Sequence, residues 1–586
     1  MRQWMVAAKK ADFYVIAEKF HVDPVVARII RNREVIGEKN IRIYLGGNLS
    51  DLSDPHQMKD MDRLVEILAQ KIRKQVHIRI IGDYDVDGVT SSHLFLTALR
   101  RVGAKVDVVI PHRIQDGYGL SLHLLQQAKE DGVDTILTCD NGIAAIDEIA
   151  WAKAQKMTVL VTDHHAVPFE EHEGRRTEKK SLADAVVNPH QQDCGYPYKE
   201  LCGAGVAWNV IRVLYENYDM DKREAEDLLD FVAMATVCDV MSLTGENRIL
   251  VKEGLKRIRH TKNIGLQALM QACNVQPENI SAYHFGYVLG PCVNATGRLD
   301  TARHALRLFE TGQETEAEEI ARDLVDLNQE RKELTLQGVE MAKKLCEEGG
   351  YENDPVLVLF LPDVHESIAG LIAGRIREMY NRPVFVLTRG EEGVKGSGRS
   401  TENYSMYENM CGCAELFTKF GGHPMAAGLS LPEENMEKFR RKINENCPLT
   451  VEEVCPDIHI DMAMPVGYAS TELVHQFALL EPFGKDNPSP LFADRNLSIS
   501  RMWLIGKNRN VLRMSVLSEY GQPVPVIFFG DVETLFAYFT EKFGQEEVEN
   551  ALHGRKNRIL FSMVYTAKID FYQGNENLQL EMKYYR

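Results

Sequence analysis

Short apolar runs alternate with amphipathic stretches between about residue 76 and residue 190. The runs "VHIRII", "AKVDVVIP", "VDTILTC", "MTVLVT" and "LADAVV" have the length and the β-branched content of strands. Helical spacing separates them, as in "VTSSHLFLTALRRVG" and in "SLHLLQQAKEDG", where Ser121 is the expected N-cap and Gly132 lies just past the end. This alternation of strands and helical spacers predicts a mainly parallel sheet with helices on both faces.

The pattern changes twice beyond residue 300. A stretch rich in Glu, Lys, Leu and Ala, ending at Gly349 and Gly350, predicts a long helix that connects two lobes. A second α/β segment follows, with the strand-like runs "PVLVLFLP" and "PVFVLTRG" on either side of a helix. From about residue 450, short and evenly spaced runs such as "PVPVIFFG" and "NLQLEMKYYR" predict a small barrel or sandwich. We therefore expect two α/β lobes joined by a long helix, followed by a β domain.

Composition narrows the class of protein. A chain of 586 residues is too long for one core, and two to four domains are expected. The N-terminus has no signal-like apolar region, and no run is long enough to span a membrane. Eleven scattered cysteines form no disulfide framework, so we expect a reducing cytoplasm. The net charge of −17 argues against a protein that coats nucleic acid non-specifically, but it allows a nucleic acid end in a locally basic groove.

Acidic residues and histidines collect at the predicted carboxyl ends of the strands, where α/β sheets bind ligands. In an extended segment, the carboxylates of "GDYDVDG" would point the same way, and unpaired anions would raise one another's pKa. A bound cation would remove the repulsion between these carboxylates. The residues are Asp83, Asp85 and Asp87 after the first strand, Asp140 after "TILTC", Asp163, His164 and His165 after "TVLVT", and Asp239 after the apolar "LLDFVAMATVC".

The ligand chemistry favours two divalent ions that share a carboxylate. A calcium loop of the helix–loop–helix type is excluded because the position that needs a Glu is Leu94 and a strand precedes the loop. A mixed oxygen and nitrogen set suits Mn²⁺, or Mg²⁺ with poorer use of the imidazole, and such a pair can activate water for displacement at phosphorus. The alternatives for the separate motifs are a solvated turn at the aspartates, an Asn-Gly turn at "TCDNG" and a hydrogen-bonded histidine at "VTDHH".

The ordered motifs resemble a known superfamily. "GDYDVDG", "TCDNGI", "VTDHH" and "ATVCDVMSLTGENR" resemble the four motifs of the DHH phosphoesterases, and "PHRIQDGYGL", "GPCVNATGRL" and "FGGHPMAAG" narrow the resemblance to the RecJ family of single-strand-specific 5′→3′ DNA exonucleases. The resemblance covers nearly the whole chain. It implies an N-terminal segment (1–52), a DHH phosphoesterase domain (53–304), a connecting helix (305–350), a DHH-associated domain (351–448) and an OB-fold that binds nucleic acid (449–586).

The resemblance also implies roles for the metal-binding and catalytic residues. Asp163 would orient a histidine, and His165 would face the scissile phosphate and stabilise the charge that develops there. A core position behind the metals is the alternative for His165. One ion would be held by Asp83, Asp85 and Asp140, and the second by Asp87, Asp140, His164 and Asp239, with Asp140 bridging the two.

Further residues are implied to bind DNA. Arg113, Arg298, Ser397 and Arg399 match the family's pocket for the 5′-phosphate, Tyr118 and Asn294 would shape the path nearby, and His423 marks the DHH-associated domain, where glycines let the backbone approach phosphate. His365 lies in "VHESIAG", which departs from the family pattern, so its role stays open. Trp503, Phe528, Phe529, Lys507, Arg509 and Arg513 are candidates for binding bases on the OB-fold, with a barrel-core role as the alternative for the two phenylalanines. Cys139 and Cys238 are expected to be small buried hydrophobes.

The sequence and the resemblance together predict a cytoplasmic exonuclease that degrades single-stranded DNA from a 5′ end, and the resemblance implies a role in repair and recombination. Metal-activated water would attack without a covalent enzyme intermediate, and a channel between the lobes would exclude duplex. A helicase and a single-strand-binding protein are candidate partners. One alternative is a DHH phosphodiesterase that degrades short oligonucleotides or cyclic dinucleotides, although such proteins usually lack the long helix and the OB-fold. The other is an inactive replication scaffold, which would have lost ligands.

Overall fold

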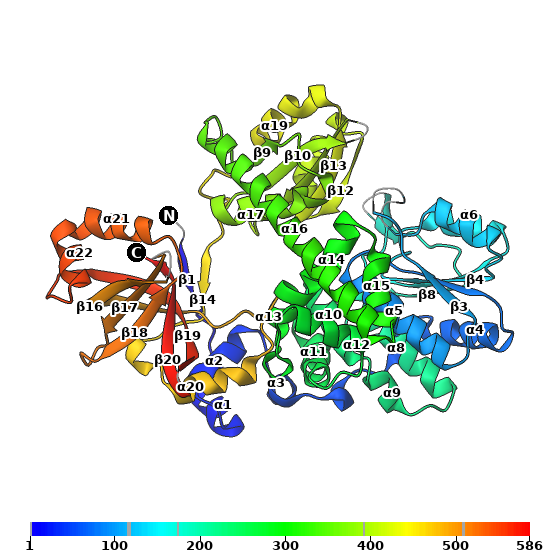
Figure 1. The fold of residues 1–586 in the computed structure, drawn as a ribbon, viewed down its shortest axis with the longest axis horizontal. Helices are drawn as coiled ribbons and strands as arrows, with labels where there is room; N and C mark the ends of the chain where they lie inside the picture. The colour runs from blue at the N-terminus through cyan, green and yellow to red at the C-terminus, as the bar shows by residue number, and fades with distance from the viewer. Residues whose placement is uncertain are drawn as a thin grey trace. The chain divides into compact units, whose positions relative to one another are not determined.

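The chain forms two compact units, residues 48–456 and residues 3–47 together with 457–586 (Figure 1). The computed structural model describes residues 3–113, 116, 119–172, 175–390, 393–506, 510–572 and 574–586. Within these residues, every helix is too short or too polar to cross a lipid bilayer. The association of the N-terminal segment with the C-terminal domain was not predicted from the sequence. The boundaries of the smaller domains stay predictions.

A parallel sheet forms the centre of the first lobe. Its strands follow the order β3-β2-β4-β5-β8, and each neighbouring pair is parallel. Because parallel strands are buried on both faces, β2 and β4 consist of buried residues throughout. The predicted fold class is confirmed here. The strands are β2 (Ile78–Ile81), β3 (Val106–Val109), β4 (Thr135–Cys139), β5 (Thr158–Thr162) and β8 (Ala185–Val187).

Helices cover both faces of this sheet, as predicted. One face packs with α4, α5, α8 and α10 into the largest core, and the other packs with α6 and α7. Ser121 caps α6 by accepting a hydrogen bond from the Leu124 N–H at 3.4 Å. The helices are α4 (Met61–Arg73), α5 (Val86–Arg101), α6 (Leu122–Glu130), α7 (Ile146–Ala154), α8 (Gly203–Asn217) and α10 (Leu229–Cys238).

Two predicted helical segments differ in the structure. Between β5 and β8 the chain forms the antiparallel pair β6 (Phe169–His172) and β7 (Arg175–Glu178), where a helical spacer was expected. This stretch is charged and has no apolar stripe that a helix could bury. The long connecting segment is also two helices, α15 (Ala302–Glu310) and α16 (Glu314–Glu347). Thr311 separates them, because its hydroxyl accepts from the Gln313 N–H at 3.1 Å and so satisfies a donor at the start of α16.

The second lobe contains a mixed sheet in the order β12-β13-β11-β10-β9. Only β9 and β10 are parallel, and the other neighbours are antiparallel. Helix α17 (Glu366–Tyr380) packs against β9 and β10, and its apolar residues form a core with the start of those strands. The strands are β9 (Leu357–Phe360), β10 (Val384–Gly390), β11 (Gly393–Arg399), β12 (Lys419–His423) and β13 (Ala426–Leu431).

The C-terminal β domain is a closed barrel. Of the two forms predicted from the sequence, a barrel or a sandwich, the structure therefore shows the barrel. Strand β16 pairs with both β17 and β19, so the order β16-β17-β18-β20-β19 returns to its start. Residues 3–47 pack on it, and a buried ion pair joins Arg33 to Asp461 at 2.8 Å. The strands are β16 (Phe492–Ile505), β17 (Val511–Leu517), β18 (Pro523–Phe528), β19 (Leu560–Tyr572) and β20 (Asn575–Tyr585).

Candidate active site

The acidic loop after β2 turns into a helix earlier than predicted. Asp85 is the N-cap of α5 and accepts from the Gly88 N–H at 3.1 Å, so Asp87 lies in the first helical turn. The expectation that three extended carboxylates point the same way is therefore wrong. Asp87 instead turns to the N-terminus of α8, where its two oxygens accept from the N–H groups of Gly203 at 2.6 Å and Ala204 at 2.7 Å.

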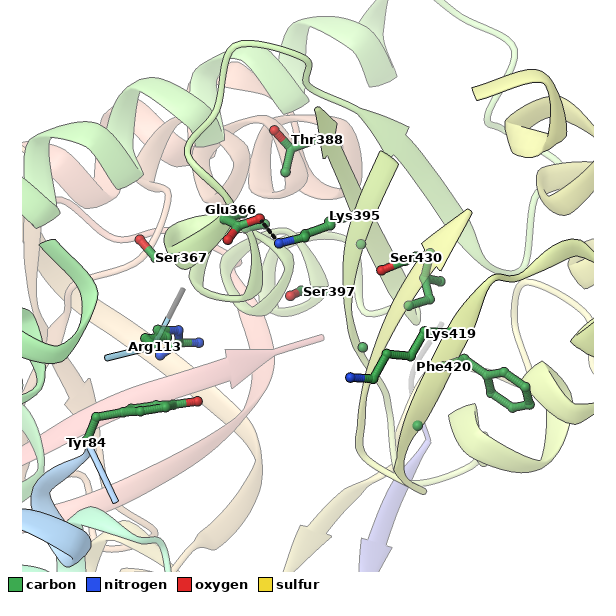
Figure 2. A pocket seen from close by; sticks show the side chains of 15 residues that line it. Tyr84, Arg113, Glu366, Ser367, Thr388, Lys395, Ser397, Lys419, Phe420 and Ser430 are labelled. Carbon is green, nitrogen blue, oxygen red and sulfur yellow. Dashed lines mark ion pairs between the residues drawn. The ribbon is translucent and has the colours of Figure 1, made fainter. Parts of the chain in front are cut away.

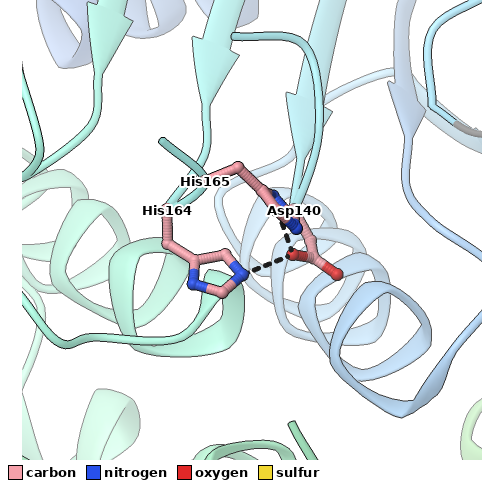
Figure 3. Close-up of side chains that lie close together, drawn as sticks. All are labelled: Asp140, His164 and His165. Atoms are coloured by element: carbon pink, nitrogen blue, oxygen red, sulfur yellow. Dashed lines mark ion pairs between the residues drawn. The ribbon is translucent and has the colours of Figure 1, made fainter. Parts of the chain in front are cut away.

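The candidate ligands nevertheless gather at the carboxyl edge of the sheet. Three groups have ligand atoms that all lie within 4.8 Å of one another. Two of the groups contain Asp140, whose Oδ1 is 3.0 Å from Nε2 of His164 (Figure 3). Asp140 therefore stands between two adjacent positions for a cation. The groups are Asp83, Asp85 and Asp140; Asp87, His164 and Asp239; and Asp140, His164 and His165.

The electrostatics of these groups call for positive charge. Burial and the neighbouring carboxylates raise the pKa of Asp83 and of Asp140 well above the usual range. Burial also lowers the pKa of His164, which favours the neutral, metal-binding imidazole. Among the described residues, Oδ1 of Asp83, Oδ1 of Asp140 and Nε2 of His164 are buried without a hydrogen-bond partner. Divalent cations fit this donor set, because they would satisfy all three atoms and offset the carboxylate charge.

Asp163 fixes the imidazole of His165. Its Oδ1 accepts from Nδ1 of His165 at 2.7 Å and from the His164 N–H at 2.7 Å, and its Oδ2 accepts from the Ile143 N–H at 2.9 Å. Burial alone would lower the pKa of His165, but the hydrogen bond and the charge of Asp163 raise it to about 9. Asp163 thus favours the cationic form of His165 and holds its ring in one orientation beside Asp140.

The start of α8 is part of the site, and the sequence analysis did not identify it. A Cβ atom on Gly203 would lie 2.6 Å from Cβ of Asp140, so only glycine permits this approach. Gly203 also donates to Asp87, which places the positive end of a helix against the carboxylates. The glycines in "LCGAG" after a loop were the available signal. Asn188 was missed as well; its side-chain amide donates to the His165 carbonyl at 2.9 Å.

The three predicted arginines lie near one another beside the carboxylates. Arg298 donates to the Ser367 carbonyl at 2.6 Å, Arg399 donates to the Gly398 carbonyl at 2.8 Å, and Arg113 lies over the Tyr84 ring at 5.0 Å. Burial and the nearby guanidinium groups lower the pKa of Arg298 to about 9. No carboxylate among the described residues forms an ion pair with any of the three. This cluster of cations can therefore hold a phosphate group.

A cavity of about 380 Å³ opens beside this cluster (Figure 2). Predicted Ser397 lines it, and a Cβ atom on Gly421 would have open space in front of it, so a ligand can reach the backbone there. Lys419 points into the cavity in Figure 2, and neither it nor Tyr84 was predicted. His423 is exposed at the end of β12 and does not line the cavity.

Other predicted residues have local structural roles or lie elsewhere. Oδ1 of Asn294 accepts from the Val86 N–H at 3.1 Å and so positions the start of α5. His365 is the N-cap of α17, and its Nδ1 lies 2.7 Å from the Ser367 hydroxyl. Tyr118, Lys507 and Arg509 lie outside the described residues.

On the barrel, the guanidinium carbons of Arg501 and Arg513 lie 5.6 Å and 5.9 Å from the ring centre of Trp503. Phe528 is buried against Tyr585, whereas Phe529 is exposed. The expected alternative, a core role, therefore applies to Phe528 only.

The two cysteines next to candidate ligands make hydrogen bonds within the core of the lobe. Cys139 is buried against the Ser92 hydroxyl, and burial raises the pKa of its thiol to about 12. Cys238 donates to the Phe285 carbonyl at 3.3 Å, and burial raises its pKa too. Both environments favour the protonated thiol, as expected for small buried hydrophobes. All eleven cysteines are free.

Comparison with known proteins identifies the family. Family models match residues 77–236 (DHH family, N-terminal domain), 353–447 (DHHA1 domain) and 460–584 (RecJ OB domain). The single-stranded-DNA-specific exonuclease RecJ of Haemophilus influenzae is 32% identical over 582 residues, which cover 96% of each chain. The chain belongs to the RecJ family. The resemblance, the enzyme class and the exonuclease activity predicted from the sequence motifs are thereby confirmed.

Two further RecJ relatives bear on length and cofactor. The Bacillus subtilis RecJ is 32% identical over 511 residues, which cover 86% of this chain and 63% of that protein, so this chain spans slightly less than two thirds of its length. The crystal structure of Thermus thermophilus RecJ in complex with Mn²⁺ matches with a TM-score of 0.81 and 25% identity, and it covers 100% of this chain and 79% of that one. This structure, together with a crystal structure of the same protein in complex with Mg²⁺ (TM-score 0.75, 24% identity), supports the predicted fold and a divalent metal cofactor, Mn²⁺ or Mg²⁺.

Proposed function

We propose that this RecJ-family exonuclease hydrolyses the phosphodiester next to a bound 5′ end of single-stranded DNA, at the edge of its parallel sheet. The observation that carries the proposal is the meeting of two ligand groups at Asp140. The arginine cluster, which would hold the end phosphate, adjoins the same loop because Arg113 lies over Tyr84, the residue after Asp83. Metal and end-binding groups are thus neighbours.

The carboxylates and the neutral His164 would hold two ions. Asp83, Asp85 and Asp140 form the first ligand set, and Asp87, His164 and Asp239 form the second. Asp140 would be shared, because its Oδ1 lies 3.0 Å from Nε2 of His164. Both sets combine hard oxygens, and the second adds an imidazole, which suits Mn²⁺ and also permits Mg²⁺. When bound, such a pair supplies activated water and stabilises charge on the phosphoryl oxygens.

The chain's own residues would orient the substrate and stabilise its charge. Arg298 and Arg399 are held by backbone carbonyls, so their remaining N–H groups can meet a 5′-phosphate in a fixed position. His165, kept cationic by Asp163, would donate to a scissile phosphate oxygen, which gains charge during hydrolysis. The attacking oxygen would come from water, with no covalent enzyme intermediate.

Cellular context also belongs to the proposal. The RecJ relatives support single-stranded DNA as the partner. We further propose that a helicase and a single-strand-binding protein present this strand, during repair and recombination in the cytoplasm. Pull-down of either protein class with the purified chain would test the first point.

The activity is tested with purified protein, Mn²⁺ and a 5′-phosphorylated 20-mer. We expect nucleotides to be released from the 5′ end of the single strand and a blunt duplex to resist. Asp140→Asn should abolish hydrolysis, because it removes the charge of the shared ligand. Asp230→Asn is the matched control, since Asp230 is equally buried in the same lobe but belongs to none of the ligand groups. Hydrolysis by Asp140→Asn at the wild-type rate, or a preference for dinucleotides over the 20-mer, would contradict the proposal.

A further inference from the structure

Two exposed tyrosines stack on each other outside the site described above. Tyr283 and Tyr287 have exposed fractions of 62% and 72%, and their rings lie 5.1 Å apart at an interplanar angle of 23°. Tyr283 belongs to the short helix α13 (Ala282–His284), and Tyr287 to the π-helix Phe285–Leu289 that follows it. Large apolar rings in water are costly, and π-helical turns are rare and frequent at functional sites. The pair is therefore a feature that needs an explanation.

The helical segment that begins with these tyrosines continues along the active site. The π-helix leads without a break into α14 (Gly290–Leu299), which ends beside the arginine cluster. Near its end, Arg298 donates to Ser367, and a Cβ atom on Gly297 would lie 2.4 Å from the Tyr84 carbonyl. Four residues earlier, Asn294 accepts from Val86 at the start of α5. This end of the segment thus adjoins the end-binding arginines and the first ligand group.

The beginning of the same segment packs against the second ligand group. The Phe285 carbonyl accepts from Cys238, the residue before Asp239, and a Cβ atom on Gly286 would lie 3.5 Å from Val237 (Figure 1 shows α10, α13 and α14). Counting back from Arg298, the segment first contacts the start of α5 through Asn294. It then contacts the end of α10 through Gly286 and Phe285, and the two tyrosines lie on either side of this second contact. A strand whose 5′ end lies at Arg298, and whose first phosphodiester lies at Asp140, would continue toward the tyrosines.

We infer that Tyr283 and Tyr287 form a platform on which bases of the single strand stack, on the 3′ side of the bond that is cut. This inference rests on the proposed function. From Asn294, Tyr287 is seven residues away and Tyr283 eleven. At about 1.5 Å per residue the distances are roughly 10 to 16 Å, or about three to five nucleotides at the spacing of stacked bases. Aromatic platforms bind any base, because every base has a flat face. The platform therefore holds the strand without reading its sequence.

The test compares substrates that do and do not reach the platform. In Tyr283→Ala/Tyr287→Ala, we expect KM for a 5′-phosphorylated 20-mer to rise roughly tenfold or more, because stacked bases are lost. The kcat/KM of a 5′-phosphorylated dinucleotide should stay at the wild-type value, since it ends before the tyrosines. The double variant Tyr283→Phe/Tyr287→Phe keeps both aromatic rings and should have the wild-type KM and kcat on both substrates. Leu182→Ala removes another exposed apolar side chain of the same lobe and should change neither substrate.

A modified strand provides the reciprocal control. A 20-mer with abasic sites at the third to fifth nucleotides should have the raised KM with the wild-type protein, and the alanine variant should not raise it further. Unchanged KM of the alanine variant on the intact 20-mer, or an equal loss on the dinucleotide, would overturn the platform. If the wild type cleaves neither substrate, the proposed function fails instead. In that case, fluorescence anisotropy of a labelled 20-mer still tests the platform, because it measures affinity for DNA without cleavage. The alanine variant should then bind the 20-mer more weakly than the wild type, and the phenylalanine variant should bind it equally well.

Discussion

Gly203 offers a sharp test of the position of Asp140. In Gly203→Ala the new methyl group would lie 2.6 Å from Cβ and 2.9 Å from Cγ of Asp140. Carbon atoms that are not bonded prefer separations of about 3.5 to 4.0 Å, so Asp140 or the start of α8 must move by roughly 1 Å. Misplacement of a catalytic group by about 1 Å can cost on the order of 100-fold in rate. We therefore expect kcat to fall roughly 100-fold.

The matched control lies in the same helical turn. A Cβ atom on Gly205 would meet the Leu201 side chain at 3.4 Å and Sγ of Cys202 at 3.8 Å, which are ordinary contacts. Gly205→Ala should therefore keep the wild-type kcat. Both variants retain the backbone N–H groups that Asp87 accepts from, so loss of a hydrogen bond cannot explain a difference between them.

The assay is release of nucleotides from the 5′-phosphorylated 20-mer in Mn²⁺, with a thermal unfolding scan to establish that each variant is folded. Overpacking costs about 1 to 3 kcal/mol, which leaves a protein of this size folded at 25 °C. If Gly203→Ala retained the kcat of Gly205→Ala, the close approach of α8 to Asp140 would not matter for hydrolysis. The assigned position of Asp140 in the site would then be wrong.

Three further predictions concern the anion pocket, metal binding and stability. Arg399→Ala should reduce the preference for 5′-phosphorylated over 5′-hydroxyl strands about tenfold and leave the Mn²⁺ affinity unchanged; an unchanged preference in competition assays would refute the pocket. The pKa values of Asp83 and Asp140 are raised, so protons compete with the metal ions for these carboxylates as the pH falls. The rise in Tm on adding Mn²⁺ should therefore be larger at pH 8 than at pH 5.5. An equal rise at both pH values would count against these residues as ligands. Burial raises the pKa of Asp230 to about 6 from 3.8 in the unfolded chain, so this group costs stability progressively as pH rises from 3.8 to about 6. Asp230→Asn should thus gain about 1 to 3 kcal/mol at pH 7 and little at pH 4 in urea unfolding, and an equal gain at both would contradict the assignment.

The sequence was most informative about the sheet. Strands such as "TILTC" are apolar and β-branched, and their carboxyl ends must meet at one edge, so the gathering of Asp140 and His164 followed from topology. Local geometry was less accessible. Asp85 could extend a strand or cap a helix, and only the packing of α5 on the sheet selects the cap. Because the helix begins at this cap, the side chain of Asp87 points to the start of α8 and not in the predicted direction.

Contacts between distant segments could not be predicted from local pattern. The glycines of "LCGAG" indicate a close approach, but they do not indicate that the neighbour of Gly203 is a residue 63 positions earlier. Similarly, the alternating runs after residue 450 fit a sandwich as well as a barrel, because both bury one face of each strand. The pairing of β16 with β19, which closes the ring, depends on tertiary contacts. The exposed tyrosine pair also needs the structure, since its spacing alone is that of an ordinary helix.

The number and position of bound metal ions test the central claim most directly. Crystals grown in Mn²⁺ should show two peaks of anomalous scattering, one among Asp83, Asp85 and Asp140 and the other among Asp87, His164 and Asp239. Crystals of Asp140→Ala grown in the same way should show neither peak at full height. A wild-type crystal with no peak at this edge of the sheet, or an Asp140→Ala crystal with both at full height, would contradict the account.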